Sequence, residues 1–94
     1  MNNPKSISLI FPLYRDKYTV KKVIDKSLKI LKKLKIKYEI IIIDDCCPEK
    51  SGLVALKYSK RNPKIKVIFH KKNYGYGAAI RSGFRNSRYE CVYA

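Results

Sequence analysis

The feature that most constrains the fold is a near-continuous apolar run at residues 38–44, YEIIIID. A strand with one wet face alternates apolar and polar side chains, whereas a strand covered on both faces is apolar almost throughout. Fully covered strands are typical of parallel sheets with helices on both sides. The run therefore predicts a buried strand of an α/β fold, from whose end Asp44 and Asp45 emerge.

The rest of the chain alternates between strand-like and helix-like patterns. Residues 20–36 carry apolar side chains at spacings of three and four, which predicts an amphipathic helix with Thr19 as its N-cap and lysines facing water. Further strands are predicted at residues 7–13, 65–70 and 89–94, and further helices at residues 51–61 and 77–87. The order β-α-β-α-β-α-β predicts one domain over residues 1–94, a Rossmann-like parallel sheet with flanking helices. Because the sequence stops in or just after the fourth strand, we expect an incomplete sheet.

The strong positive charge limits the partners. The chain has 22 basic and seven acidic residues, a formal net charge of +15, which permits binding to anionic lipid headgroups, to phosphorylated ligands or to nucleic acid. The basic residues are scattered and mostly lysine, which favours a solvated surface and disfavours specific nucleic-acid recognition. No apolar run reaches the length of a membrane span, and no signal peptide is recognisable. We therefore expect a cytoplasmic protein, with peripheral contact at the inner membrane face as an option.

Three predicted loops, at residues 12–17, 44–50 and 71–77, follow the carboxyl ends of parallel strands and should share one edge of the sheet, where open α/β sheets bind ligands. Successive strand residues point to opposite sides. One carboxylate of Asp44 and Asp45 can therefore face the crevice and accept hydrogen bonds from a ligand, while the other braces nearby loops. Solvated loop acids or a cap on the next helix are the alternative.

A second motif is NYGYGAAIR at residues 73–81. Its Gly75 and Gly77 permit close backbone approach before a helix, and helix N-termini attract anions. The motif follows the third strand rather than the first, and Ile80 stands where a dinucleotide fingerprint needs a small residue, so a nicotinamide site is excluded. The three cysteines lack metal-site spacing, and no metal site is expected in this chain.

Taken in order, the segments SLIFPLY (8–14), EIIIIDD (39–45) and NYGYGAAIRSGF (73–84) resemble the family 2 glycosyltransferases. The resemblance is greatest to the polyprenyl-phosphate branch, which includes enzymes like dolichol-phosphate-mannose synthase. It implies a nucleotide-diphospho-sugar transferase fold of the GT-A type. The implied activity is transfer of a hexose from a nucleotide-diphosphate sugar to a lipid phosphate, such as polyprenyl phosphate, or to a glycan.

The resemblance also implies roles for individual residues. Pro12 and Tyr14 would line the nucleobase pocket, and one aspartate of the pair, preferably Asp45, would bind the base or ribose. Asp16 would replace a glutamate that the family usually has. The segment 73–81 would shape the floor beside the nucleotide. The complete set of implied donor-binding residues is Pro12, Tyr14, Asp16, Asp44, Asp45, Asn73, Gly75 and Arg81.

The chain departs from the family pattern at Arg15-Asp16, where the family usually has Asn-Glu, and at residues 46–49, CCPE, where it favours small polar residues. The largest departure is an absence. The family's Asp-x-Asp motif, which holds Mg²⁺ or Mn²⁺ against the diphosphate, would be expected just beyond residue 94, and the catalytic base further on. The chain would thus be the N-terminal, nucleotide-binding part of the family domain and would lack catalytic residues. Alternatives are a non-catalytic nucleotide-binding or interaction module, in which a partner chain completes the sheet, and a basic nucleic-acid-binding domain.

Overall fold

The computed structural model describes residues 6–13, 17–46 and 51–93. Its elements are β1 (Ser6–Leu13), α1 (Lys17–Leu34), β2 (Lys37–Asp44), α2 (Ser51–Arg61), β3 (Ile65–Phe69), α3 (Tyr76–Arg85) and β4 (Glu90–Tyr93). Every predicted strand and helix is present, with ends displaced by up to three residues. The predicted α/β fold with alternating elements is confirmed.

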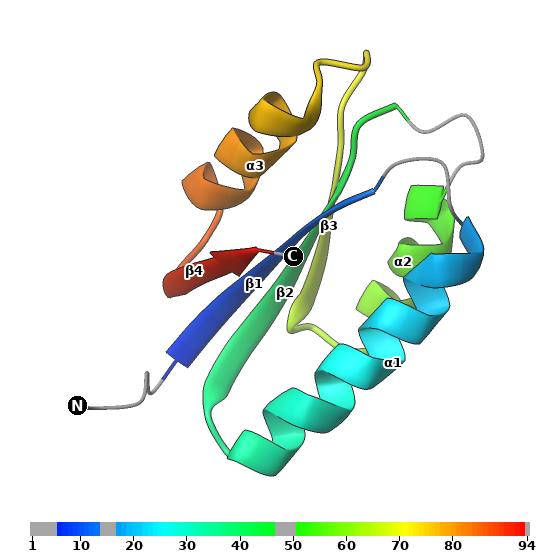
Figure 1. The fold of residues 1–94 in the computed structure, drawn as a ribbon. Coiled ribbons are helices and arrows are strands. Elements are labelled where there is room, and N and C mark those ends of the chain that lie inside the picture. The colour runs from blue at the N-terminus through cyan, green and yellow to red at the C-terminus, as the bar shows by residue number, and fades with distance from the viewer. Residues whose placement is uncertain (1–5, 14–16, 47–50, 94) are drawn as a thin grey trace.

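The four strands form one sheet in the order β3-β2-β1-β4, and each pair of neighbours is parallel (Figure 1). The order reverses at β1, because β2 and β3 are added on one side of it and β4 on the other. In open α/β sheets, a ligand crevice forms outside the carboxyl ends of the strands at such a reversal. The topology therefore predicts a ligand crevice at the end of β1, at Pro12 and Leu13.

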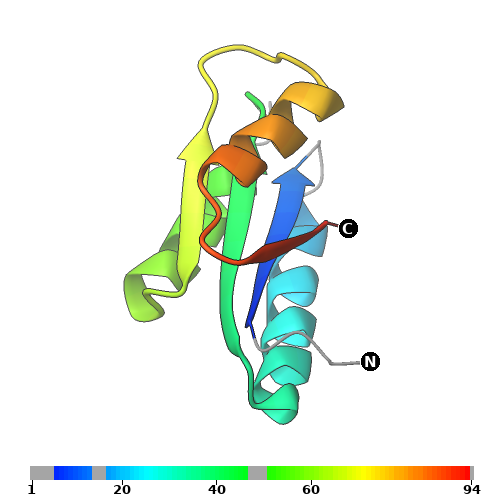
Figure 2. The same cartoon turned by 90° about the vertical axis from the view of Figure 1, so that its left-hand side faces the viewer.

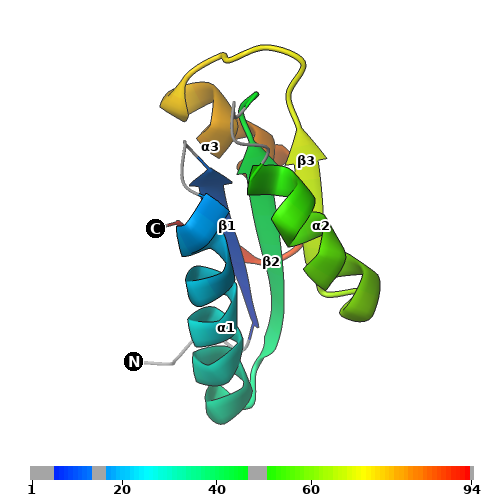
Figure 3. The ribbon, with the colours of Figure 1, turned by 90° about the vertical axis from the view of Figure 1, so that its right-hand side faces the viewer.

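Helices cover both faces of the sheet. Helices α1 and α2 lie on one face and α3 on the other (Figures 2 and 3). The central strand β2 shows why both layers are needed: Ile40 and Ile42 are buried in the cluster beneath α1 and α2, whereas Ile41 and Ile43 are buried in the cluster beneath α3. The apolar run that predicted a doubly covered strand is explained by this alternation.

Helix α1 differs from the prediction at both ends. It begins at Lys17, so Thr19 lies inside its first turn and the N-cap prediction for Thr19 is wrong. The apolar periodicity that predicted this helix begins only at Val20. The first residues of the helix precede that pattern, so the pattern could not place its start. At the other end Lys35 adopts a φ of 55°, the left-handed conformation that usually ends a helix at a glycine. A lysine there gives no sequence signal, and the helix stops two residues early.

The outer face of α1 is covered by lysines, as predicted, and all of them are exposed: Lys21, Lys22, Lys26, Lys29, Lys32 and Lys33. Within the part of the chain that the structure describes, none of the helices combines the length and the hydropathy needed to cross a bilayer.

A buried carboxylate ties the start of β4 to the sheet. Glu39 Oε2 accepts hydrogen bonds from Ser8 Oγ and from the backbone N–H of Arg88, both at 2.6 Å. Its Oε1 lies 2.8 Å from Lys66 Nζ. Ser8 Oγ in turn accepts the backbone N–H of Tyr89 at 2.9 Å. Burial alone would raise the pKa of Glu39, but the bonds from Lys66, Ser8 and Arg88 lower it below its usual value.

Candidate functional site

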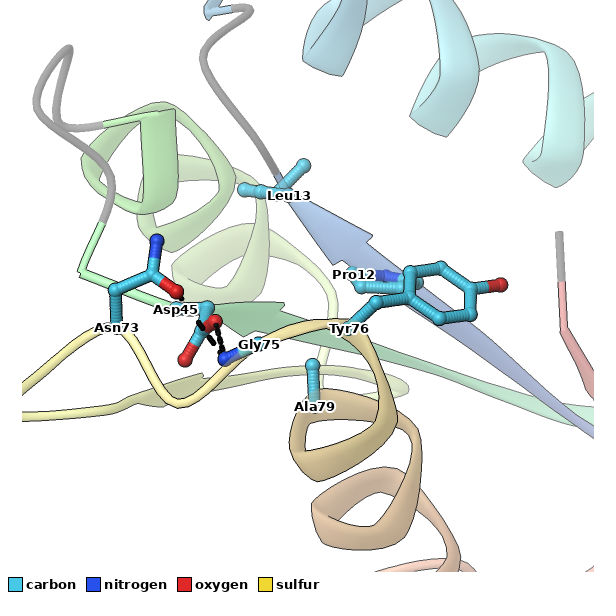
Figure 4. Close-up of a pocket in the computed structure, with 7 residues that line it drawn as sticks. All are labelled: Pro12, Leu13, Asp45, Asn73, Gly75, Tyr76 and Ala79. Atoms are coloured by element: carbon cyan, nitrogen blue, oxygen red, sulfur yellow. Dashed lines mark hydrogen bonds between the residues drawn. The ribbon is translucent and has the colours of Figure 1, made fainter.

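A pocket of about 340 Å³ lies at the carboxyl ends of β1 and β2, against the N-terminus of α3 (Figure 4). It is lined by Pro12, Leu13, Asp45, Asn73, Gly75, Tyr76 and Ala79. These residues come from three segments that are far apart in the sequence. The structure therefore brings together four of the predicted site residues: Pro12, Asp45, Asn73 and Gly75.

Asp45 organises one wall of this pocket. Its Oδ1 accepts the backbone N–H of Tyr74 at 2.9 Å and its Oδ2 accepts that of Gly75 at 2.8 Å. His70 Nδ1 lies 2.8 Å from the same Oδ1. The side chain is only 6% exposed. Asp45 thus holds the loop that follows β3, while its edge toward the pocket leaves room for a further hydrogen bond, since a carboxylate has about four acceptor positions.

Asp44 lies on the opposite side of the sheet from Asp45, as the strand alternation predicts. Its Oδ2 accepts the backbone N–H of Gly52 at 2.9 Å, close to the start of α2 at Ser51. A carboxylate at a helix N-terminus satisfies an N–H that has no partner within the helix. Asp44 is not among the residues that line the pocket, and its carboxylate makes the helix cap that the sequence left open as an alternative.

The segment 73–75 forms a tight turn at the mouth of the pocket. Gly75 has a φ of 95°, in the left-handed region that side chains other than glycine rarely adopt. Its N–H also approaches Asn73 Oδ1 at 3.1 Å, and its carbonyl accepts the N–H of Ala79 in the first turn of α3. The turn therefore presents the N-terminus of α3 to the pocket, where helix dipoles favour negatively charged groups.

Tyr76 is a lining residue that the sequence analysis missed. The residue is 62% exposed, and in Figure 4 its ring lies beside Pro12 with the hydroxyl directed outward. A ring exposed at the edge of an apolar pocket can stack on a flat ligand. Its position between Gly75 and Gly77, in a loop predicted to reach the ligand edge, was the available signal.

Of the remaining predicted site residues, one is described and lies away from the pocket. Arg81 is exposed on α3 and does not line the pocket. Tyr14 and Asp16 lie outside the described residues. No group of three or more His, Cys, Asp or Glu side chains that could hold a metal ion is found in the described part of the chain.

The pKa of Asp45 supports an ionised carboxylate at the pocket. Burial would raise the pKa, but the hydrogen bonds from His70, Tyr74 and Gly75 lower it below the usual value. A carboxyl whose folded pKa is depressed stabilises the fold fully above its unfolded pKa, and this contribution is lost as the pH falls through the folded pKa.

We expect the free energy of unfolding to be flat above about pH 5 and to fall below it, because Asp45 and Glu39 both have lowered pKa values and ordinary values near pH 4. Each group contributes at most about 1.4 kcal/mol per pH unit to the slope. Urea midpoints measured from pH 7 to pH 3 test this. Glu39→Gln should give a shallower acid slope than the wild-type chain, and an unchanged slope would contradict the assignment.

The architecture can be compared with solved structures. It superposes with a TM-score of 0.75 on mannosyltransferase PcManGT from Pyrobaculum calidifontis, solved in complex with GDP-Man and Mn²⁺. The match covers 93% of this chain and 25% of that one, at 12% sequence identity. The likeness defines the class of the fold, a GT-A nucleotide-sugar transferase fold of which this chain forms a part.

The family follows from the sequence match. The model of the family described as "Glycosyl transferase family 2" matches residues 8–93, and the chain belongs to that family. A dolichyl-phosphate beta-glucosyltransferase from Homo sapiens is 33% identical over 95 residues. An undecaprenyl-phosphate 4-deoxy-4-formamido-L-arabinose transferase from Photorhabdus laumondii is 28% identical over 81 residues. These matches cover 94% and 85% of this chain but only 29% and 25% of the relatives. The chain thus spans less than a third of their length.

Proposed function

We propose that this chain is the nucleotide-sugar-binding part of a family 2 glycosyltransferase that moves a hexose from a nucleotide-diphosphate sugar to a lipid phosphate. The observation that carries the proposal is the pocket at the end of β1, where Pro12, Asp45, Gly75 and Tyr76 meet in a chain of this family. A lipid-phosphate acceptor is proposed because relatives are named as dolichyl-phosphate and undecaprenyl-phosphate transferases.

The chemistry of the pocket suits a nucleoside. Its apolar surfaces, Pro12, Leu13 and the Tyr76 ring, offer contact to the flat face of a base, and Asp45 and Asn73 supply polar groups at one side. Ligand sites commonly combine a mostly apolar lining with a few placed polar groups. We assign the base to the Pro12–Tyr76 side and an N–H or hydroxyl of the nucleoside to Asp45.

The diphosphate requires more than the described residues supply. A divalent cation is expected in the complete enzyme, since the neighbouring mannosyltransferase was solved with Mn²⁺. The described residues offer no cluster to hold one. The match to the human relative covers only 29% of that protein, and we propose that the metal ligands and the catalytic base lie in the part of the family domain that this match does not cover. The exposed lysines of α1 would favour a position beside anionic headgroups at the inner membrane face.

A non-catalytic nucleotide-binding module is the second candidate. It is favoured by the same pocket, whose described lining suits a nucleoside but includes no residue that we assign to the transfer step. The two candidates agree on nucleotide binding and differ on transfer. Under neither candidate do we expect hexose transfer by the 94-residue chain on its own.

Nucleotide binding should be visible as thermal protection. We expect uridine or guanosine diphosphate at ten times its Kd to stabilise the chain by about 1.4 kcal/mol, which for a domain of this size raises Tm by several degrees, at about 4–8 °C per kcal/mol. Thermal denaturation followed by circular dichroism, with each nucleotide in turn, measures this shift and identifies the base.

Tyr76 provides a matched pair of variants for the same experiment. Tyr76→Phe keeps the ring and should keep the shift, whereas Tyr76→Ala removes a stacking surface and should weaken binding by about tenfold, since base–aromatic stacking is worth about 1–3 kcal/mol. Because the side chain is exposed, neither variant should lower Tm without nucleotide. No shift with either nucleotide in the wild-type chain would refute the proposed function.

A further inference from the structure

A chain of three buried or half-buried polar side chains runs from the pocket into α3. His70 is the first residue after β3, and its ring is 12% exposed. Its Nδ1 lies 2.8 Å from Asp45 Oδ1, and its Nε2 lies 2.7 Å from Ser82 Oγ. The chain Ser82–His70–Asp45 therefore links α3, the end of β3 and the residue after β2.

The hydrogen bonds fix the tautomer of His70. An ionised carboxylate only accepts, so Nδ1 must carry the proton that is donated to Asp45. Nε2 then accepts the Ser82 hydroxyl when the ring is neutral. If the ring is protonated, Nε2 donates instead, and Ser82 Oγ can accept because a hydroxyl does both. The geometry of these three side chains is thus compatible with both a neutral and a protonated His70 ring.

The position of the pocket shows which of the three side chains can contact a ligand. The same order of groups activates a serine nucleophile in hydrolases, but here Asp45 lines the pocket and neither His70 nor Ser82 does. The end that faces a ligand is the carboxylate. Asp45 in turn accepts the N–H groups of Tyr74 and Gly75, and Gly75 lines the pocket beside it.

We propose that His70 is a positioning residue for the donor nucleotide: held by Ser82, it fixes the Asp45 carboxylate, and through it the turn at residues 73–75, in the shape that binds the nucleoside. This inference rests on the proposed function for the identity of the ligand. Its structural content, that His70 orders the Tyr74 and Gly75 amides, stands independently of any ligand. A further contact supports it, because the His70 and Tyr74 rings meet edge to face with centroids 5.5 Å apart.

Two amide substitutions separate the two nitrogens of the ring. The amide nitrogen of asparagine stands one atom beyond Cβ–Cγ, where His70 has Nδ1, so His70→Asn keeps a donor for Asp45. The amide nitrogen of glutamine stands one atom further, near the place of Nε2, so His70→Gln keeps a partner for Ser82 and loses the donor to Asp45. A role in mere packing would not distinguish these two variants in favour of the smaller one.

The experiment measures the 94-residue chain and its variants by two readouts. Titration calorimetry gives the Kd for uridine and guanosine diphosphate, and hydrogen exchange followed by NMR gives the protection of the Tyr74 and Gly75 amides without nucleotide. We expect His70→Asn to stay within about threefold of wild type and His70→Gln to bind about tenfold more weakly, with the two amides exchanging about tenfold faster, as for one lost hydrogen bond to a charged group. Ser82→Ala should give a smaller change in the same direction.

The outcomes are distinct. Equal Kd values and equal exchange in His70→Asn and His70→Gln would overturn the inference. Weaker binding with unchanged exchange at Tyr74 and Gly75 would overturn it as well, because the loop would then not be the link. A wild-type chain that binds neither nucleotide would refute the proposed function, while the exchange rates in the same samples still decide whether His70 orders the turn. Should His70→Gln not fold, Ser82→Ala carries the comparison.

Discussion

Asp45→Asn is expected to lower the free energy of unfolding by about 3 kcal/mol and to abolish protection by nucleotide. Three donors converge on the two carboxylate oxygens: the amides of Tyr74 and Gly75 and the ring of His70. An asparagine offers one oxygen, so its NH₂ group must face at least one N–H. A buried donor left without an acceptor costs its full desolvation, and the two facing donors also repel each other.

The neighbouring carboxylate supplies the matched control. Asp44→Asn is the same chemical change one residue earlier, but Asp44 Oδ2 accepts the N–H of Gly52 at the start of α2, and the amide oxygen of asparagine can accept the same N–H. We expect Asp44→Asn to cost less than about 1 kcal/mol and to leave nucleotide protection in place. Urea denaturation with and without nucleotide measures both effects. Equal losses in the two variants would contradict the separate roles assigned to the pair.

The separate roles of Asp44 and Asp45 show how much of the site could be predicted from the sequence. Strand alternation predicted that Asp44 and Asp45 point to opposite sides, and the order of the elements predicted that their edge is the ligand edge. Which side holds the crevice depends on α3 crossing to the other face and on β4 pairing with β1. The side of the sheet that holds the crevice is set by packing between segments more than thirty residues apart, and no local sequence pattern predicts it.

The same reason explains the residues that were missed. His70 and Ser82 lie on different elements, and nothing in the spacing of twelve residues indicates that their side chains meet. The available sign was weak: His70 is the chain's single histidine, and it stands at the end of a predicted strand. Buried polar groups are paired as a rule, so a histidine at a ligand edge could have prompted a search for its partners.

The ends of the strands were easier to predict from the sequence than the ends of the helices. Strands were placed within one residue at their buried ends, because the apolar pattern stops where burial stops. Helix ends depend on caps, and two of them use unexpected residues: Lys35 in a left-handed conformation after α1, and Asn86 after α3, whose side chain donates to Ser82 O at 2.8 Å. Neither position carries the glycine that usually announces a helix end.

Helix α3, which contributes Tyr76 and Ala79 to the pocket, lies against the sheet through Gly83. A methyl group added there would overlap Cγ2 of Ile10 and stand 3.0 Å from its Cγ1 and Cδ1. Ile10 is fully buried on a central strand, so its branched side chain has no free direction in which to move. Gly83→Ala must therefore lift α3 or shift β1, and overpacking of this kind costs about 1–3 kcal/mol, against a gain in helix propensity of about 1 kcal/mol.

Gly77 gives the comparison that isolates this contact. It lies in the same helix, and a methyl group there would meet only Arg81 Nη1, at 3.4 Å. We expect Gly77→Ala to be neutral or to stabilise by up to about 1 kcal/mol, whereas Gly83→Ala should destabilise and also weaken nucleotide binding, because Tyr76 and Ala79 move with the helix. In a double-mutant cycle, Ile10→Ala with Gly83→Ala should cost less than the sum of the single changes, since the shortened side chain makes room for the methyl group. Additive losses in urea denaturation would mean that α3 does not rest on Ile10 through Gly83, and the wall of the pocket would then need another support.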